Sequence, residues 1–155
     1  MTQIDQMKQI NDITYRIIGS IYKVNKELGP GLLESVYEEA LCSQMIEDGL
    51  YVERQIGVPL YYNGKKLHTH LRLDILVNRM VIVELKAIES ICPIHNMQLD
   101  TYLRLANIQL GLLVNFNTTN IRDDIHRRIN PFYDNNKVLE ITKLDNGDKE
   151  SFISV

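Results

Sequence analysis

The residues best suited to chemistry in this chain lie in one short stretch, RLDILVNRMVIVELKA, residues 72–87. Apolar residues alternate with polar ones on both sides of residues 78–80, a pattern that predicts two strands joined by a turn. The polar positions include two acids, Asp74 and Glu84, with Lys86 two residues beyond the second acid. Two carboxylates and an amine on one hairpin could bind a cation and an anionic group beside it.

Burial fixes how the two strands of this hairpin pair. The odd positions of both strands are apolar, and a slip of one residue would turn one of these sets away from the core. We therefore expect one face of the hairpin to be core and the other to carry every charge. In that register Asp74 lies opposite Glu84, with Cβ atoms about 5 Å apart. Like charges at this distance destabilise a strand pair and raise each other's pKa.

A cation would neutralise such a pair of acids. All-oxygen ligands suit a hard ion, Mg²⁺ or Mn²⁺, and Lys86 could aim its ammonium at a phosphate or an attacking water. The alternative is a solvated sheet face on which Lys86 merely bridges the acids. A third arrangement uses His68 and His70, which alternate onto the face of Asp74 and could form a transition-metal site with it. Plain surface histidines would explain the same pattern.

Helical patterns flank the hairpin in the sequence. Apolar residues at intervals of three and four predict amphipathic helices over 12–28 and 31–49, separated by a Gly-Pro-Gly break. A third helix is predicted to begin at Pro93, a favoured first-turn residue, and to end near Asn107. These helices must pack against the predicted strands to bury their apolar faces.

Further strands are predicted on both sides of the hairpin. Asn63-Gly64 indicates the tight turn of another hairpin, and residues 110–116 form a short apolar run typical of a buried strand. Beyond Thr119 the pattern weakens. There, 121–129 could form a short helix and 137–141 a late edge strand. The predicted fold class is mixed α/β, in one domain spanning 1–155.

Two of the predicted helices carry polar side chains that could join the hairpin. Glu34 and Tyr37 are three residues apart and share a face, although a first-turn carboxylate favoured by the helix dipole explains Glu34 equally well. His95, Gln98 and Tyr102 form one stripe on the third helix, which a solvated face would also explain. Because that helix begins soon after the hairpin, we expect its stripe to lie near the acids.

Composition excludes several classes of protein. The chain has 155 residues, of which 45% are hydrophobic and 24% charged, as in ordinary globular proteins. No apolar run approaches the roughly 20 residues of a membrane span. The N-terminus does not resemble a signal peptide, and Cys42 and Cys92 form no metal-binding pattern. We therefore expect a cytoplasmic protein with free thiols that makes no contact with a membrane.

The net charge of −3 weighs against a protein that coats nucleic acid electrostatically. It does not exclude an enzyme that contacts nucleic acid over a small basic area and a metal ion. Local positive charge occurs at Lys65-Lys66, at Arg72 and within 122–128. Each cluster, taken alone, is typical of a solvated surface.

Taken together, these residues resemble a known family. Residues 31–37, GLLESVY, match the GxxExxY signature, and Asp74 followed by 84–86, ELK, resembles the D…ExK core of the PD-(D/E)XK nuclease superfamily. Residues 98–102, QLDTY, resemble the QxxxY element of its RecB-like branch. The resemblance covers residues 11–129, with the elements in matching order. One departure is that a leucine, rather than proline, precedes Asp74.

The resemblance implies a fold and an activity. The fold would be a PD-(D/E)XK nuclease-like core, a central mixed β-sheet flanked by helices, with two N-terminal helices and a C-terminal extension over 130–155. The activity would be Mg²⁺- or Mn²⁺-dependent hydrolysis of DNA phosphodiester bonds by an activated water. The alternative is a catalytically silent module that keeps the fold and binds nucleic acid or protein. DNA is favoured over RNA as partner, a homodimer is expected, and endonuclease and exonuclease action both stay open.

The resemblance also implies roles for individual residues. The ion would be held by Asp74, Glu84 and the backbone carbonyl of Leu85, and a helix-borne acid would bind it directly or through water. The lysine would orient the water or stabilise charge on the phosphate, and two side chains of the third helix would position lysine and phosphate. The catalytic residues implied are Glu34, the helix-borne acid, with Asp74, Glu84, Lys86, Gln98 and Tyr102.

Overall fold

The computed structural model describes residues 1–144. In chain order the elements are α1 (Gln3–Leu28), α2 (Glu34–Glu47), β1 (Val52–Tyr62), β2 (Lys65–Val77), β3 (Val81–Lys86), α3 (Pro93–Ala106), β4 (Leu110–Asn115), the 3₁₀ helix η1 (Ile121–Asp124), β5 (Ile125–Ile129) and β6 (Thr142–Lys143). The predicted mixed α/β fold class and the two N-terminal helices are therefore confirmed. The predicted C-terminal extension is described only as far as residue 144, and its last part lies outside the described residues.

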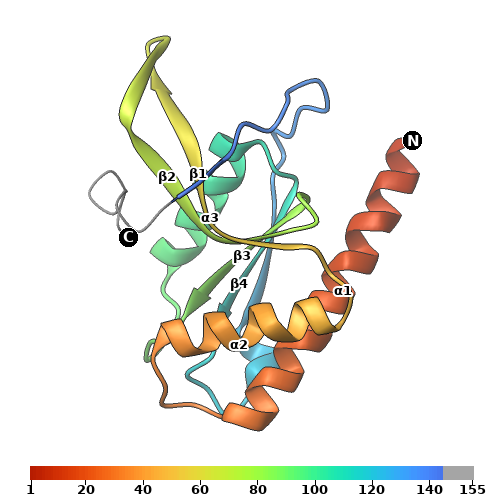
Figure 1. Ribbon diagram of the computed structural model, residues 1–155, viewed down its shortest axis with the longest axis vertical. Helices are drawn as coiled ribbons and strands as arrows, with labels where there is room; N and C mark the ends of the chain where they lie inside the picture. Colours follow the sequence, from red (N-terminus) through yellow and green to blue (C-terminus); the bar gives the residue numbers. More distant parts are fainter. Residues whose placement is uncertain (145–155) are drawn as a thin grey trace.

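The strands form one sheet with helices on both faces. Their order is β5-β4-β3-β2-β1-β6; β3 and β4 are parallel, and the other described pairs are antiparallel. Helices α1 and α2 cover one face and α3 covers the other (Figure 1). Of the helices in residues 1–144, none is both long and apolar enough to cross a bilayer. Because both faces are covered, polar side chains near the middle of the sheet are removed from solvent.

The first helix begins earlier than its apolar stripe predicted. Thr2 and Asp5 form a capping box, in which Thr2 Oγ1 accepts from the Asp5 N–H at 3.1 Å and Asp5 accepts from the Thr2 N–H at 3.3 Å. This reciprocal cap satisfies backbone donors at the helix start and extends α1 to Gln3. The second helix, predicted over 31–49, runs from Glu34 to Glu47; its C-cap is Asp48, and Gly49 beyond the cap is left-handed, at φ 87°.

The predicted register of the β2–β3 hairpin is confirmed. Ile75 pairs with Val83, and Val77 pairs with Val81. The turn uses Asn78 and Arg79, both left-handed, at φ 50° and 54°. Two left-handed central residues define a type I′ turn, whose twist matches that of the strands it joins.

The prediction that one face of the hairpin is pure core is wrong for the part of β2 that precedes Asp74. Ile75 and Val77 pack under α1 and α2, but Leu71 and Leu73, at the same parity, pack on the α3 side. Side chains of a regular strand alternate faces with period two, so the strand must rotate between 73 and 75. The even-numbered residues of this hairpin do not form a solvated face either. Where β2 pairs with β3, α3 covers them.

The rotation coincides with an irregular residue in the neighbouring strand. Gln55 of β1 is left-handed, at φ 51°, and sits opposite Asp74 where regular pairing is interrupted. Pairing resumes on both sides without a change of register, at Arg54 with Ile75 and at Ile56 with Leu73. A left-handed glutamine inside a strand is unusual and costs free energy, and such residues are frequent near functional sites.

Two predictions near the C-terminus are wrong. Residues 121–129 form η1 followed by the strand β5, rather than a helix, because β5 pairs with the free edge of β4. The late strand is β6 at 142–143, not 137–141, and it pairs with Ile56 and Gly57 of β1. In both cases the edge of an existing sheet decides the conformation, and a weak local pattern does not contain that information.

Candidate active site

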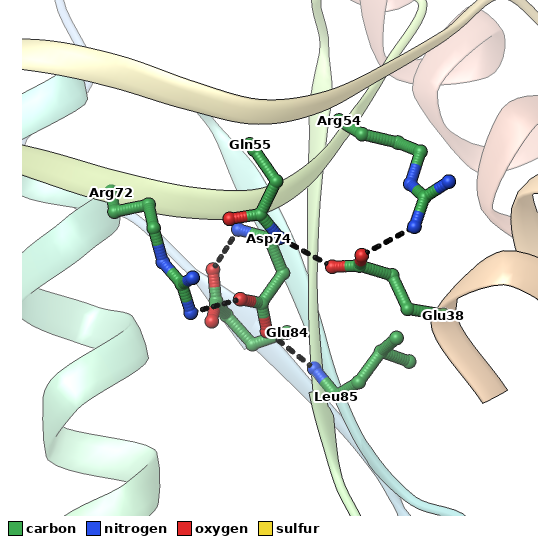
Figure 2. Close-up of polar contacts among 7 residues, drawn as sticks. All are labelled: Glu38, Arg54, Gln55, Arg72, Asp74, Glu84 and Leu85. Carbon is green, nitrogen blue, oxygen red and sulfur yellow. Dashed lines mark hydrogen bonds and ion pairs between the residues drawn. The ribbon is translucent and has the colours of Figure 1, made fainter. Parts of the chain in front are cut away.

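Asp74 and Glu84 meet where β2 separates from β3. Regular pairing ends at Ile75 and Val83, and the acids themselves supply the next contacts. The Asp74 N–H donates to Glu84 Oε1 at 3.1 Å, and the Leu85 N–H donates to Asp74 Oδ2 at 3.1 Å (Figure 2). The acids are only 5% and 6% exposed. The carboxylates therefore fill the opening between two diverging strands.

The pKa of Glu84 is raised well above that of an ordinary glutamate. Burial is the largest cause, and the charge of Asp74 and a hydrogen bond with its carboxyl act in the same direction. The Lys86 ammonium lowers the pKa of Glu84, but less than these causes raise it. Arg72 Nη2 approaches Asp74 Oδ1 at 3.3 Å and forms an ion pair with it. Burial beside Asp74 therefore disfavours the charged form of Glu84, and a bound cation would favour it.

Lys86 stands at the end of β3, beside the acid pair. It pairs with Asn115 of β4 and is half-buried, and its ammonium makes no ion pair or hydrogen bond within residues 1–144. The chain beyond it is held by Asn115, whose buried amide donates to the Ile88 carbonyl at 2.9 Å and accepts from the Ile88 N–H at 3.1 Å. Asn115 therefore fixes the exit from β3, a role that sequence reasoning missed.

Tyr37 proves to be a structural residue of the GLLESVY segment. It is fully buried, and its ring stacks on Phe116 with centroids 4.9 Å apart. Its hydroxyl donates to the Gly29 carbonyl at 2.5 Å and accepts from the Leu32 N–H at 3.1 Å. These contacts tie the loop before α2 to the core and so fix the position of Glu34, the first residue of that helix.

Glu34 faces the acid pair from α2. Partial burial of its carboxyl raises its pKa, as does the charge of Asp74, while Lys86 and Arg72 lower it. Glu34 as a whole residue is exposed to solvent. In residues 1–144 no three His, Cys, Asp or Glu side chains lie close enough together to hold one metal ion. Glu34 thus acts on the pair electrostatically, from outside its immediate contacts.

The arrangement of His68 and His70 with Asp74 is not formed. Within residues 1–144 these three side chains do not come together into a group that could hold a metal ion. The reason is geometric, because His70 lies four residues from Asp74 along an extended strand, a distance of about 13 Å. The transition-metal alternative is therefore wrong.

The polar stripe of α3 divides into different roles. Tyr102 is buried, and its pKa is raised first by burial and then by the charges of Glu84 and Asp74, so its hydroxyl stays protonated beside the acids. Gln98 is half-buried and makes no side-chain hydrogen bond within 1–144. His95 instead caps the helix, its Nδ1 accepting from the Cys92 N–H at 2.9 Å.

Close packing of α3 on the sheet brings this stripe near the acids. A Cβ added at Gly111 of β4 would lie 2.9 Å from Leu99 Cδ1, so glycine permits the approach. Asp100 of α3 is engaged by a residue of the sheet rather than of its own helix. It binds Arg128 of β5 through two hydrogen bonds, at 2.6 and 2.8 Å. This ion pair fastens α3 to the sheet edge.

Sequence reasoning also missed a network beside Asp74. Glu38 is 9% exposed, and its two oxygens accept from Arg54 Nη2 at 2.8 Å and Gln55 Nε2 at 2.7 Å (Figure 2). Two successive strand residues reach the same carboxylate only because Gln55 is left-handed. The sequence did indicate that Glu38 lies one helical turn after Glu34. It gave no indication that Gln55 would adopt a left-handed conformation.

Comparison with known protein families gives a match over most of the chain. The PD-(D/E)XK nuclease superfamily profile matches residues 11–128. The chain belongs to the PD-(D/E)XK nuclease superfamily. No curated protein and no solved structure matches it significantly.

Membership agrees with the arrangement around the diverging strands. PD-(D/E)XK proteins are generally nucleases that cleave phosphodiester bonds, typically with divalent metal ions. This supports a nuclease-type function with nucleic acid as the substrate class. The assignment to the GxxExxY group and to the QxxxY branch stays a prediction.

Proposed function

We propose that this protein is a Mg²⁺- or Mn²⁺-dependent nuclease that hydrolyses DNA phosphodiester bonds. The observation that carries the proposal is the meeting of Asp74 and Glu84 in a buried opening, where their mutual repulsion is incompletely balanced. Lys86 beside them has an ammonium without a partner in residues 1–144. A strongly perturbed acid such as Glu84, with a neighbouring free cation, is typical of catalytic sites.

The residues present fit a hard divalent ion. Asp74 and Glu84 offer carboxylate oxygens, and the Leu85 carbonyl lies on the same side of β3 as its N–H, which faces Asp74. Glu34 would complete this set through a water, as its separation from the pair requires. A set made of oxygens suits Mg²⁺ or Mn²⁺ rather than a softer metal. When bound there, the ion would polarise a phosphoryl oxygen and lower the pKa of water.

The other side chains have roles that follow from their chemistry. Lys86 Nζ, a donor only, would hydrogen-bond a phosphate oxygen or hold the attacking water in place. Tyr102 keeps its proton, so its hydroxyl is also a donor toward the phosphate. Gln98 would orient the lysine through its amide. Attack of water on phosphorus would release a 3′-hydroxyl and leave a 5′-phosphate.

A cleavage assay tests this proposal. Plasmid and linear DNA are incubated with Mg²⁺ or Mn²⁺, with and without a chelator, using wild-type protein and the variants Lys86→Ala and Asp74→Ala. We expect metal-dependent cleavage by the wild type and its loss in both variants. The control is Lys8→Ala, an exposed residue of α1. A wild-type rate no greater than that of the two site variants would overturn the proposal.

The second candidate is a catalytically silent module that binds nucleic acid through the same fold. This candidate is favoured because only two side chains could bind a metal ion directly. No group of three such ligands forms within residues 1–144. Such a module would bind DNA in a salt-dependent way without cutting it. Its affinity for DNA would be unchanged by Asp74→Ala, whereas a metal-bound substrate complex would be weakened.

A further inference from the structure

The segment from Gln55 to Leu73 has a charge opposite to that of the whole chain. It contains no Asp or Glu, although the protein has 20 acids and a net charge of −3. Its basic residues are Lys65, Lys66 and Arg72, with the titratable His68 and His70. A concentration of positive charge in an acidic protein indicates an anionic partner at that place.

This basic segment forms most of the β1–β2 hairpin, including its outer end. The ends of both strands project away from the body of the molecule (Figure 1). The tip is the predicted turn Asn63-Gly64, both residues left-handed, at φ 49° and 76°. A register shift between Pro59 and Tyr61 interrupts the pairing, and such irregularities bend and twist a strand pair.

We call residues 61–68 the arm, because every one of them is exposed while the base of the hairpin is packed. At the base, Leu60 and Leu71 are buried on the α3 side. In the arm, Tyr61 and Tyr62 are 55% and 68% exposed. Surfaces that bind nucleic acid combine exposed aromatic residues with lysines, as the arm does.

The two lysines of the arm are free to bind an anion. Neither Lys65 nor Lys66 makes an ion pair or a side-chain hydrogen bond within residues 1–144. Tyr61 is partly engaged, since its hydroxyl donates to Glu140 at 3.3 Å. Tyr62 has no such contact in the described chain. The lysines and Tyr62 are therefore the residues of the arm that a partner would meet first.

The arm is connected to the proposed active site by a single strand. β2 is antiparallel to β3, so its N-terminal part leaves the sheet at the end where β3 reaches Lys86. Arg72, between arm and site, already contacts Asp74 at 3.3 Å. From Asp74 to Lys66 the strand spans at most about 26 Å, which equals the length of about eight phosphates along one strand of B-form DNA.

We propose that the arm binds the phosphate backbone of duplex DNA at a distance of up to about eight nucleotides from the bond to be cut. Lys65 and Lys66 contact phosphates, and Tyr62 packs against the sugar edge. This inference rests on the proposed function, because the DNA is placed at the acid pair. It explains how a protein of negative net charge holds a polyanion: binding is confined to one basic strand and arm.

Binding to DNA tests the arm separately from cleavage. The double variant Lys65→Ala/Lys66→Ala is compared with Lys8→Ala/Lys26→Ala, which removes the same charge from two exposed lysines of α1. Fluorescence anisotropy on a duplex of about thirty base pairs, in a chelator, gives affinity at several salt concentrations. We expect the arm variant to lose about tenfold in affinity. The slope of log affinity against log salt should fall by about two.

Further measurements complete the test. Tyr62→Ala should weaken binding several-fold, and melting temperatures of all variants should stay near the wild type, because the arm is exposed. On a DNA hairpin with a stem of about four base pairs, too short to span site and arm, metal-dependent cleavage by the arm variant should equal that of the wild type.

Failure of this inference differs from failure of the proposed function. Wild-type affinity and salt slope in the arm variant, or an equal loss in the α1 control, would overturn the role of the arm. A wild type that binds no duplex but binds an acidic peptide through the arm would also overturn it. If the wild type cleaves nothing but binding still depends on the arm, the proposed function fails and the arm remains a DNA-binding element.

Discussion

Two regions of the same sheet bury acids in opposite surroundings. Glu53 of β1 is 6% exposed and faces Arg79, whose Nε donates to it at 3.1 Å and whose Nη2 lies at 3.5 Å. Asp74 and Glu84 are equally buried but face each other, and the nearest arginine, Arg72, approaches only one of them. The first acid has its own counter-charge, whereas the pair has more negative charge than its surroundings balance.

This difference separates an acid with a structural role from the pair that we propose to be functional. Burial of a carboxylate is tolerable when an ion pair compensates for its lost hydration, and Arg79 provides that ion pair for Glu53. Arg79 is also one of the two left-handed residues of the β2–β3 turn. Burial of two acids against each other raises the pKa of Glu84 and stores repulsion that an external cation would relieve. Among buried acids, incomplete neutralisation is therefore the better indicator of a site than burial itself.

The largest expected effect comes from Glu84→Gln. The amide keeps an oxygen for the Asp74 N–H and adds a donor toward the Asp74 carboxylate, so repulsion becomes a hydrogen bond. We expect DNA cleavage to fall by about a hundredfold or more, while the melting temperature stays the same or rises by a few degrees. Cleavage rates and thermal unfolding of the same preparation measure both. A Glu84→Gln protein that is active, or clearly less stable, would contradict the comparison.

Glu38→Ala should have an intermediate effect. It removes the acceptor of Arg54 and Gln55, and with it a support of the left-handed residue opposite Asp74. We expect a loss of about 1–3 kcal/mol in the free energy of unfolding and about tenfold in cleavage rate. Glu39→Ala, on the exposed side of α2, is the matched control. Unchanged cleavage in Glu38→Ala would show that Gln55 does not need this support.

Glu53→Ala should affect stability alone. Its partner Arg79 is 58% exposed and stays hydrated after the substitution, so the expected loss is about 1 kcal/mol. That loss corresponds to a decrease of about 2–4 °C in the melting temperature. Cleavage per folded molecule should equal that of the wild type, which urea denaturation and a cleavage assay together establish. If Glu53→Ala reduced cleavage as strongly as Glu84→Gln, the proposed division of the acids would be wrong.

The smallest effect is a pH dependence of stability in metal-free protein. The folded state raises the pKa of Glu84 above its ordinary value of 4.5, so above pH 4.5 the folded state binds more protons than the unfolded state. Stability is thus lost as pH rises from 4.5 through the raised pKa. We expect the melting temperature in a chelator to show this decrease, and Glu84→Gln to lack it. A decrease of the same size in Glu84→Gln would assign it to another group.

The features that sequence predicted correctly are those set by local periodicity. Alternation over residues 71–85 fixed the register of β2 and β3, and so brought Asp74 against Glu84. Asn63-Gly64 predicted its turn because few residue pairs accept left-handed conformations at low cost. The third helix followed from its spacing and from Pro93. In each case the relevant interactions join residues close in sequence or constrained to one strand face.

The features that sequence reasoning missed depend on contacts between distant segments. Glu38 acquires its role from two residues of β1, and the rotation of β2 lies opposite the left-handed Gln55 of the neighbouring strand. The strand β5 forms because β4 has a free edge. His70 and Asp74 share parity in sequence, yet they are too far apart along the strand to bind one ion.

By itself, then, the sequence determined that two acids and a lysine belong to one hairpin, since the two-residue period of a strand leaves few other arrangements. Only the tertiary structure decided that both acids are buried, that Tyr37 anchors the loop before α2, and that a basic arm extends from the proposed site. Burial and charge balance depend on what packs against a side chain, and the surroundings that make Glu84 unusual come from several elements of the fold.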